Sequence, residues 1–257
     1  MNDSVLKTLG VAFAICMVCS LIVSFAAVSL RDLQKENAAN NKSIKILQAA
    51  KMYDNTIDVK SQFQKLEMRY VDFDTGKVLQ SYKDFKIEEY DQIKSTRDST
   101  LSTALSASDD IAIIKNREDV GKFFIVRDEQ NNIDKLILPI RGYGLWGTLF
   151  GYVAIEEDFN TVAGLEFYEH KETPGLGAEV DNPRWKALWP GKKIYKDNEV
   201  QLSVIKGKVQ SDDINSNYKV DGLSGATLTS RGVTNMITYW FGDSGYSKLF
   251  KELDYES

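Results

Sequence analysis

Residues 135–170 read KLILPIRGYGLWGTLFGYVAIEEDFNTVAGLEFYEH, in which short apolar runs alternate with glycine-rich or polar connections. The runs cover residues 135–140, 151–158 and 162–170. Each is short and rich in β-branched or aromatic side chains, which is typical of strands. Their spacing is that of hairpins, so neighbouring strands are expected to be antiparallel.

The flanking sequence adds strands and helices to this centre. KFFIVRD (122–128) predicts a preceding strand, with turns at DTGK (74–77) and DEQNN (128–132). Downstream, EVQLSVIKG (199–207) alternates as a strand, and NPRWKALWPG (182–191) suits a short amphipathic helix. In RGVTNMITYWFGD, the residues that share one helical face are Val233, Met236, Ile237 and Trp240. Antiparallel strands with interspersed helices predict an α+β fold.

An uncharged segment lies near the N-terminus, from Thr8 to Leu30. At about 1.5 Å per residue it would extend roughly 34 Å, enough to cross a bilayer. A cleaved signal peptide is the main rival, but its apolar region is usually shorter. We therefore expect a single transmembrane helix. The predicted parts are a short tail (1–7), the span (8–30), a stalk helix over 31–66 that opens the first part of the soluble domain (31–134), and a ligand-binding domain (135–257).

Composition excludes several classes of protein. The net charge of −5 gives no basic footprint for nucleic acid. The two cysteines, Cys16 and Cys19, both lie inside the apolar segment, where the C-x-x-C spacing has no βαβ context and the pair is expected to pack as small hydrophobes. The single histidine, His170, argues against a multi-histidine zinc enzyme and is expected to be structural. Chemistry here must therefore come from a cofactor.

Two glycine clusters flank the last two strands of the centre. GYGLWG (142–147) matches G-x-G-x-x-G, but strands are predicted on both sides, so it is interpreted as a hairpin rather than a dinucleotide site. Trp146 at its tip could form a wall for a flat ligand. HKETPGLGAE (170–179) has the composition of a turn that lets backbone N–H groups approach a ligand, or of a plain surface loop. It presents Glu172, Thr173, Leu176 and Gly177 together.

The third cluster is DGLSGATLT (221–229), just before the last predicted helix. With that helix expected to begin near Thr229 or Ser230, one reading is that either residue caps it. The other reading is a phosphate-bearing ligand at the helix N-terminus, where N–H groups are unsatisfied. A cap alone does not require the other polar and small residues at fixed offsets, which are Asp221, Ser224, Gly225, Ala226 and Thr227.

DGLSGAT (221–227) resembles the flavinylation motif D-x-x-S/T-G-A-T of bacterial FMN-binding domains, and ETPGLG (172–177) resembles their second signature. With one N-terminal span, the whole chain is similar to the C-subunit family of Na+-translocating NADH:quinone reductases. The resemblance implies an α+β FMN-binding domain behind the membrane helix. It also implies FMN joined to Thr227 through a phosphoester, attached by a separate flavin transferase. The other residues assigned to the flavin site are Asp221, Ser224, Gly225, Ala226, Glu172, Thr173, Leu176, Gly177 and Trp146.

The family implies an electron-carrying subunit, not catalytic alone, in an inner-membrane complex that oxidises NADH, reduces ubiquinone and exports Na+. Its soluble domain would be periplasmic and its partners other membrane subunits. Charge bias points the other way, because Lys7 precedes the span whereas Arg31, Lys35, Lys42 and Lys45 follow it. Two alternatives stay open: the G subunit of an Rnf-type electron-transport complex, and a non-redox anchored domain that binds a phosphorylated ligand.

Overall fold

The computed structural model describes residues 4–80, 82–83 and 90–256. The chain divides into two compact units, residues 1–42 and 43–257. Helix α1 (Val5–Ala49) is long and apolar enough to cross a membrane by length and composition. The first three residues of the predicted tail 1–7 lie outside the described residues.

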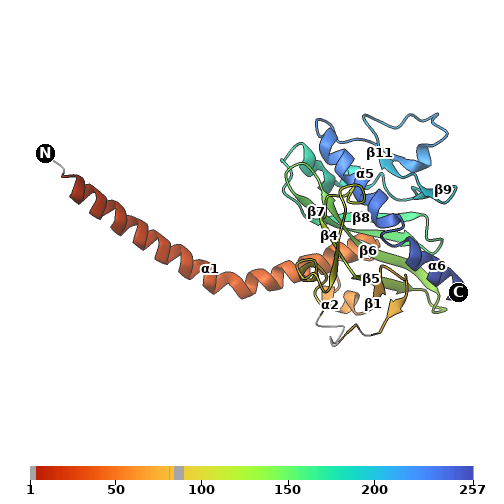
Figure 1. Cartoon of the computed structure of the whole chain (residues 1–257), viewed down its shortest axis with the longest axis horizontal. Coiled ribbons are helices and arrows are strands. Elements are labelled where there is room, and N and C mark those ends of the chain that lie inside the picture. The colour runs from red at the N-terminus through yellow and green to blue at the C-terminus, as the bar shows by residue number, and fades with distance from the viewer. Residues whose placement is uncertain (1–3, 81, 84–89, 257) are drawn as a thin grey trace. The chain divides into compact units, whose positions relative to one another are not determined.

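A six-stranded antiparallel sheet forms the centre of the second unit, with the strand order β2-β1-β5-β6-β7-β8. From β5 to β8, each strand pairs with the next strand along the chain as a hairpin, as the spacing of residues 135–170 predicted (Figure 1). The strands are β1 (Glu67–Asp72), β2 (Val78–Leu79), β5 (Val120–Arg127), β6 (Ile133–Tyr143), β7 (Thr148–Glu156) and β8 (Val162–Glu169).

Alternation along the strands builds a separate core on each face of the sheet. In β5, Phe123 packs into the larger core and Phe124 into the smaller one. In β6, Leu136 and Ile137 divide in the same way, as the twofold period of a strand requires. The larger core contains helix α5 (Thr227–Phe241) and helix α6 (Ser247–Glu256), whereas the last turn of α1 covers the other face. The α+β class is confirmed.

Short elements complete the second unit. The helices are α2 (Val59–Phe63), α3 (Gln92–Ser95), α4 (Pro183–Lys186) and the 3-10 turns η2 (Gly177–Asp181) and η3 (Ser216–Tyr218). The strands form three small pairs: β3 (Ser102–Ala104) with β4 (Asn116–Glu118), β9 (Tyr195–Lys196) with β10 (Glu199–Val200), and β11 (Ser203–Val204) with β12 (Lys219–Val220).

Three elements are shorter than predicted. The strand over 199–207 is broken into β10 and β11, because the N–H groups of Gln201 and Leu202 both turn to the carbonyl of Ile194. The stalk helix over 31–66 ends at Ala49, where Lys51 adopts a left-handed conformation (φ 58°) and Met52 N–H closes on Leu47 O at 2.8 Å. The helix over 182–191 is a single turn, α4.

Candidate functional site

The buried carboxylate of Glu172 joins three segments that are distant in sequence. Its Oε1 accepts hydrogen bonds from the N–H groups of Leu145 and Trp146, at 2.9 and 3.0 Å, at the tip of the β6–β7 hairpin. Its Oε2 accepts one from the hydroxyl of Thr229, at 2.5 Å, in the first turn of α5. The predicted residues Trp146 and Glu172 are therefore brought together, through the backbone of Trp146.

Hydrogen bonding keeps this carboxylate ionised. Burial is the largest single influence and would raise the pKa of Glu172. The hydrogen bonds from Thr229, Trp146 and Leu145 together outweigh burial, so the pKa lies below its ordinary value. A fixed negative charge thus holds the hairpin tip to the helix start.

Two glycines allow Glu172 to come this close. A Cβ at Gly144 would lie 2.5 Å from Glu172 Oε1. A Cβ at Gly177 would lie 2.4 Å from Glu172 Oε2 and 2.6 Å from the hydroxyl of Thr229. Both contacts are shorter than any ordinary packing distance, so each position needs a residue without a side chain. Gly177 of the predicted set therefore shapes the site through Glu172.

The turn that precedes α5 places Thr227 as the first residue of the helix, two to three residues earlier than predicted. Its N-cap is Ala226, which has no side-chain oxygen, so the helix start carries no side-chain cap. The capping reading of Thr229 and Ser230 is wrong, because Thr229 bonds Glu172 and the Ser230 hydroxyl accepts from Leu223 N–H at 3.1 Å.

Thr227, the last residue of the motif, and Thr229, two positions later, differ in exposure. Thr227 is exposed, whereas Thr229 is 0% exposed and its hydroxyl is engaged by Glu172. A cavity of about 260 Å³ opens beside Thr227. Its lining includes the cations Lys206 and Arg231 but no carboxylate. A phosphate on the Thr227 hydroxyl would therefore meet positive charge and the unpaired N–H groups of a helix start.

Lys206 and Arg231 were not anticipated from the sequence. Arg231 follows Thr227 by four residues on a helix, a spacing that places both on one face, so this signal was available. Lys206 lies 21 positions before Thr227 and reaches the cavity only because β11 pairs with β12 ahead of the motif. Only the folded chain reveals that neighbourhood.

Exposed apolar side chains surround the helix start. Trp146 is 63% exposed, and Leu176 and Leu228 are about half exposed. Leu176 lies against the motif, since a Cβ at Gly225 would be 2.9 Å from Leu176 Cδ2. Gly225 also has φ +71°, a conformation that favours glycine. These surfaces are suited to a flat aromatic ring beside a phosphate.

The remaining predicted residues have other positions. Ser224 is exposed in the turn, and Thr173 is exposed in its loop, where its carbonyl accepts from Leu176 and Ala178 N–H groups. Asp221 accepts from Val209 N–H at 2.8 Å, and its carbonyl accepts from the Trp185 indole. The Asp221 carboxylate thus organises the loop that carries Lys206.

His170 has hydrogen-bond partners on both ring nitrogens, which fits the structural role predicted for it. Its Nε2 pairs with Asp181 Oδ2 at 2.9 Å, and its Nδ1 accepts from Glu172 N–H at 3.3 Å. The acceptor role of Nδ1 assigns the proton to Nε2. The imidazole therefore holds the backbone of Glu172 in place. GYGLWG is likewise the predicted hairpin, closed by Gly144 N–H on Gly147 O at 2.8 Å.

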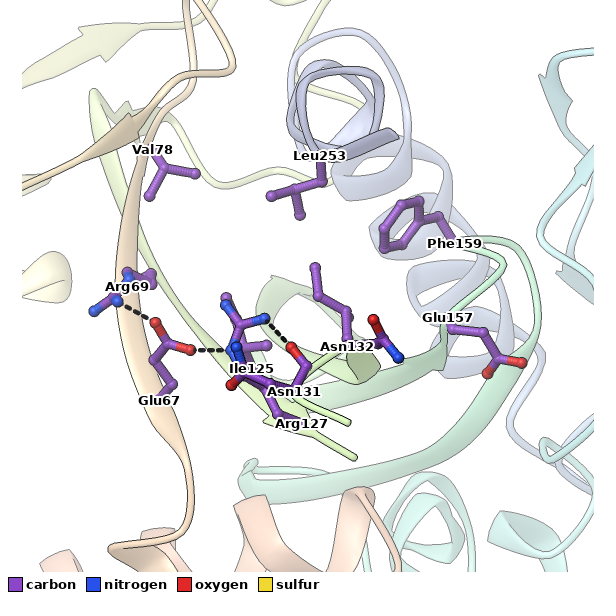
Figure 2. Close-up of a pocket in the computed structure, with 11 residues that line it drawn as sticks. Glu67, Arg69, Val78, Ile125, Arg127, Asn131, Asn132, Glu157, Phe159 and Leu253 are labelled. Carbon is purple, nitrogen blue, oxygen red and sulfur yellow. Dashed lines mark hydrogen bonds and ion pairs between the residues drawn. The ribbon is translucent and has the colours of Figure 1, made fainter. Parts of the chain in front are cut away.

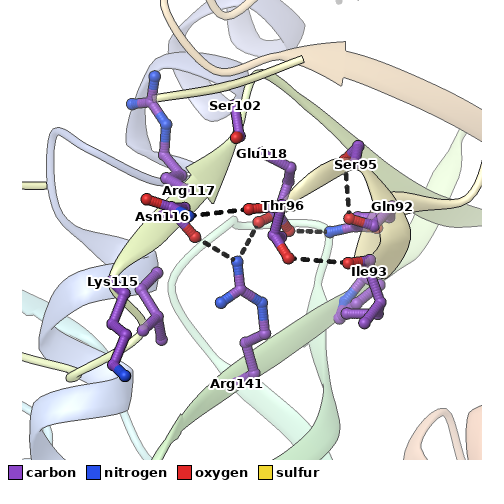
Figure 3. A network of polar contacts seen from close by, with 12 residues as sticks. Gln92, Ile93, Ser95, Thr96, Ser102, Lys115, Asn116, Arg117, Glu118 and Arg141 are labelled. Atoms are coloured by element: carbon purple, nitrogen blue, oxygen red, sulfur yellow. Dashed lines mark hydrogen bonds and ion pairs between the residues drawn. The ribbon is translucent and has the colours of Figure 1, made fainter. Parts of the chain in front are cut away.

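Two other polar regions lie away from the motif. A recess of about 610 Å³ holds Glu67 between Arg69 and Arg127, and none of the predicted site residues lines it (Figure 2). The buried Arg141 of β6 pairs with Glu118 of β4, which also accepts from Gln92 Nε2 at 2.5 Å (Figure 3). Both sets of charges are paired internally, which favours structural roles.

The fold and site define an FMN-binding domain, and the family model described as "FMN-binding domain" matches residues 144–242. The residues present at this site fit FMN. The cations and the helix start suit its phosphate, and the exposed side chains of Trp146 and Leu176 suit its flavin ring. The match begins at the hairpin tip and ends just after α5. It therefore encloses all three segments that Glu172 joins.

Relatives that align over nearly their full length identify the family to which this FMN-binding protein belongs. The C subunit of the Na(+)-translocating NADH-quinone reductase of Pseudomonas aeruginosa is 42% identical over 98% of this chain and 97% of its own length. The corresponding C subunit from Vibrio vulnificus is 44% identical over 98% and 96%. The crystal structure of Shewanella oneidensis NqrC aligns with a TM-score of 0.74 at 33% identity, covering 85% of this chain and 99% of that one. The chain belongs to the family of Na+-translocating NADH-quinone reductase C subunits, as its motifs predicted.

Proposed function

We propose that this chain is an electron-carrying flavoprotein subunit with FMN bound covalently to Thr227. The observation that carries the proposal is the contrast between the hydroxyl of Thr227, the last residue of the motif, and that of Thr229, two positions later. Thr227 is exposed at an uncapped helix start beside Lys206 and Arg231, whereas Thr229 is buried on Glu172. The relatives' names support membership of a complex that oxidises NADH, reduces a quinone and translocates Na+. The quinone is proposed to be ubiquinone and the Na+ transport to be export. The relatives do not favour the G subunit of an Rnf-type complex.

Attachment of the flavin requires a separate flavin transferase. A threonine hydroxyl is a weak nucleophile without an activating base. The two carboxylates of the site are engaged elsewhere: Glu172 accepts from Thr229 and the hairpin tip, and Asp221, in the motif itself, accepts from Val209 N–H. The transferase would form the bond from Thr227 Oγ1 to the FMN phosphorus, release AMP from FAD and pass the hydroxyl proton to solvent. Lys206 and Arg231 would then face the phosphoester charge.

The flavin supplies the redox chemistry when bound, and the chain positions it. Lys206, Arg231 and the helix start would hold the phosphate end. Trp146 and Leu176 would flank the flavin ring, and Glu172 and Gly177 would fix the loops that carry these two side chains. The backbone around the flavin would be shaped by Thr173, Ser224, Gly225, Ala226 and Asp221. GYGLWG opens no helix, so NADH oxidation is assigned to another subunit.

The chain is placed in the bacterial inner membrane with residues 8–30 of α1 as its single span. The soluble part, residues 31–134 followed by the FMN-binding domain 135–257, would lie in the periplasm. This orientation is proposed from the resemblance to the reductase C subunits, and the charges that flank the span oppose it. Its partners would be the other membrane subunits of the reductase.

Intact mass spectrometry tests the covalent site. Thr227→Val and Thr229→Val are matched variants, because each replaces one hydroxyl by a methyl group of similar size. The parent chain, produced with a flavin transferase, should gain the mass of FMN minus one water. Thr229→Val should retain this gain and Thr227→Val should lose it.

Other mass-spectrometry results would favour a different attachment residue or a domain without covalent flavin. A gain that survives Thr227→Val would place the flavin on another residue. No gain in the parent would leave the non-redox domain that binds a phosphorylated ligand as the better reading.

A further inference from the structure

Three glutamates are buried in the described part of the chain, and only two of them are neutralised by basic side chains. Glu118 pairs with one arginine, and Glu166 pairs with two lysines. Glu172 is 5% exposed and has no lysine or arginine partner among the residues that the structure describes. An ion without a counter-ion is costly to bury, and such groups are concentrated at functional sites. Glu172 is therefore a buried charge that the chain leaves uncompensated.

Hydrogen bonds alone hold this charge. The donors are the N–H groups of Leu145 and Trp146 and the hydroxyl of Thr229. The imidazole of His170 adds no positive charge, because its Nδ1 carries no proton and accepts from the backbone N–H of Glu172. The three hydrogen bonds outweigh burial and keep the pKa of Glu172 below its ordinary value. The site thus contains one buried negative charge at neutral pH.

The joint between the hairpin tip and α5 does not itself require a charge. A glutamine at position 172 would offer one carbonyl oxygen to the two N–H groups and an NH2 group to the Thr229 hydroxyl. Its hydrogen bonds would be weaker than those of a carboxylate, but no ion would be buried. The carboxylate therefore brings to the site a charge that the connection of the segments does not need.

The charge lies beside the backbone of both side chains that are proposed to flank the flavin ring. Glu172 Oε1 is 3.0 Å from the backbone nitrogen of Trp146. Glu172 Oε2 lies against Gly177, the residue after Leu176, where a Cβ would be 2.4 Å away. Backbone contacts fix the carboxylate whatever rotamers these two exposed side chains adopt. Because the carboxylate is buried, solvent screens its field less than the field of a surface charge.

We propose that the uncompensated carboxylate of Glu172 lowers the reduction potential of the FMN bound at Thr227. At pH 8, full reduction of a flavin takes up two electrons and one proton, which leaves one added negative charge on the ring. The carboxylate repels this charge and so favours the oxidised flavin. Glu172 itself transfers no electron or proton. The inference rests on the proposed flavin site and adds to it the direction in which the chain shifts the potential of its cofactor.

Redox titration of the flavin-loaded, full-length chain in detergent at pH 8 tests this proposal. Glu172→Gln keeps the size of the side chain and removes its charge. At a fixed applied potential, the ratio of reduced to oxidised flavin, measured by absorbance, should rise about fivefold or more. At about 30 mV for each tenfold change in a two-electron couple, this rise corresponds to a midpoint about 20 mV higher. A smaller rise, or a fall, would overturn the proposal.

Two further variants separate the charge from the hydrogen-bonded joint. Thr229→Val removes one hydrogen bond and keeps the charge, so the reduced-to-oxidised ratio should stay unchanged or fall. Glu169→Gln removes an exposed charge on β8 and should change the ratio by less than about twofold, because solvent screens that charge. A rise in either variant equal to that of Glu172→Gln would attribute the shift to loosening of the site or to net charge, and would overturn the proposal.

Intact mass of the same samples reports flavin attachment separately. Absorbance measures only the loaded fraction, so incomplete loading of a variant does not alter its reduced-to-oxidised ratio. A parent chain without flavin would overturn the proposed function and this inference with it. Loaded parent and loaded Glu172→Gln with equal ratios would overturn this inference alone and leave the flavin site at Thr227 standing.

Discussion

Glu172 shows how one side chain can organise a site whose parts are distant in sequence. It sits 57 residues from Thr229 and 27 from Leu145, yet it bonds both. Removing its charge by Glu172→Gln should cost roughly 1–3 kcal/mol of unfolding free energy, because hydrogen bonds to a charged acceptor are the stronger kind. Urea denaturation at pH 7 measures this, with Glu169→Gln as an exposed control on β8 that should change by less than about 0.5 kcal/mol.

The same residue predicts a pH dependence with a definite sign. The pKa of Glu172 in the folded chain lies below its ordinary 4.5, so its stabilisation is complete above that value. It is lost only as the pH falls through the lower, folded pKa. The difference between the parent and Glu172→Gln should therefore be constant from pH 7 to pH 5 and shrink below pH 4. A difference that grew on acidification would contradict the assigned charge state.

The sequence motifs identified the residues of this site but not all of their roles. ETPGLG and DGLSGAT were selected by motif, and the structure joins them through Glu172, Gly177 and Thr229. A motif gives no information on which of two threonines is buried. That distinction depends on a carboxylate from another segment, so only tertiary structure decides it.

Helix α5 owes its position to a glycine with no room for a side chain. A Cβ at Gly232 would lie 2.4 Å from the carbonyl oxygen of Tyr143, at the end of β6. Gly232→Ala should therefore destabilise the fold by about 1–3 kcal/mol, although alanine favours helices, because the backbones must separate. Thermal unfolding measures this, with Asn235→Ala, less buried on the same helix, as the control. A stabilised Gly232→Ala would show that α5 can shift without loss.

Some helices and strands were predicted correctly from the sequence and others were not. Strands β5 to β8 were predicted because alternation and apolar runs are local signals. The segment 199–207 alternates equally well but breaks, since Ile194 accepts the N–H groups of Gln201 and Leu202. The end of α1 was missed because a left-handed lysine gives no sequence signal comparable to glycine. Local patterns thus predicted the central strands, whereas a tertiary hydrogen bond and a left-handed residue decided where other elements ended.

At the level of the whole chain, the membrane helix and the folded domain share one continuous element. Residues up to 42 form a unit of their own, whereas Ile46, Leu47, Ala49 and Ala50 belong to the smaller core of the domain. The last turn of α1 is therefore part of the domain's interior and not only a stalk. An anchor joined in this way cannot be removed at an arbitrary point.

Two truncations test this division. A chain that begins at Ser43 keeps the smaller core and should unfold cooperatively as a soluble domain. A chain that begins at Asp54 loses Ile46 and Leu47, which at about 1.5–3 kcal/mol for each buried side chain removes roughly 3–6 kcal/mol. Because typical domains are stable by only about 5–15 kcal/mol, the shorter chain should be marginal or unfolded. Urea unfolding followed by tryptophan fluorescence compares them, and equal midpoints would show that α1 contributes nothing to the domain beyond its connection to the membrane.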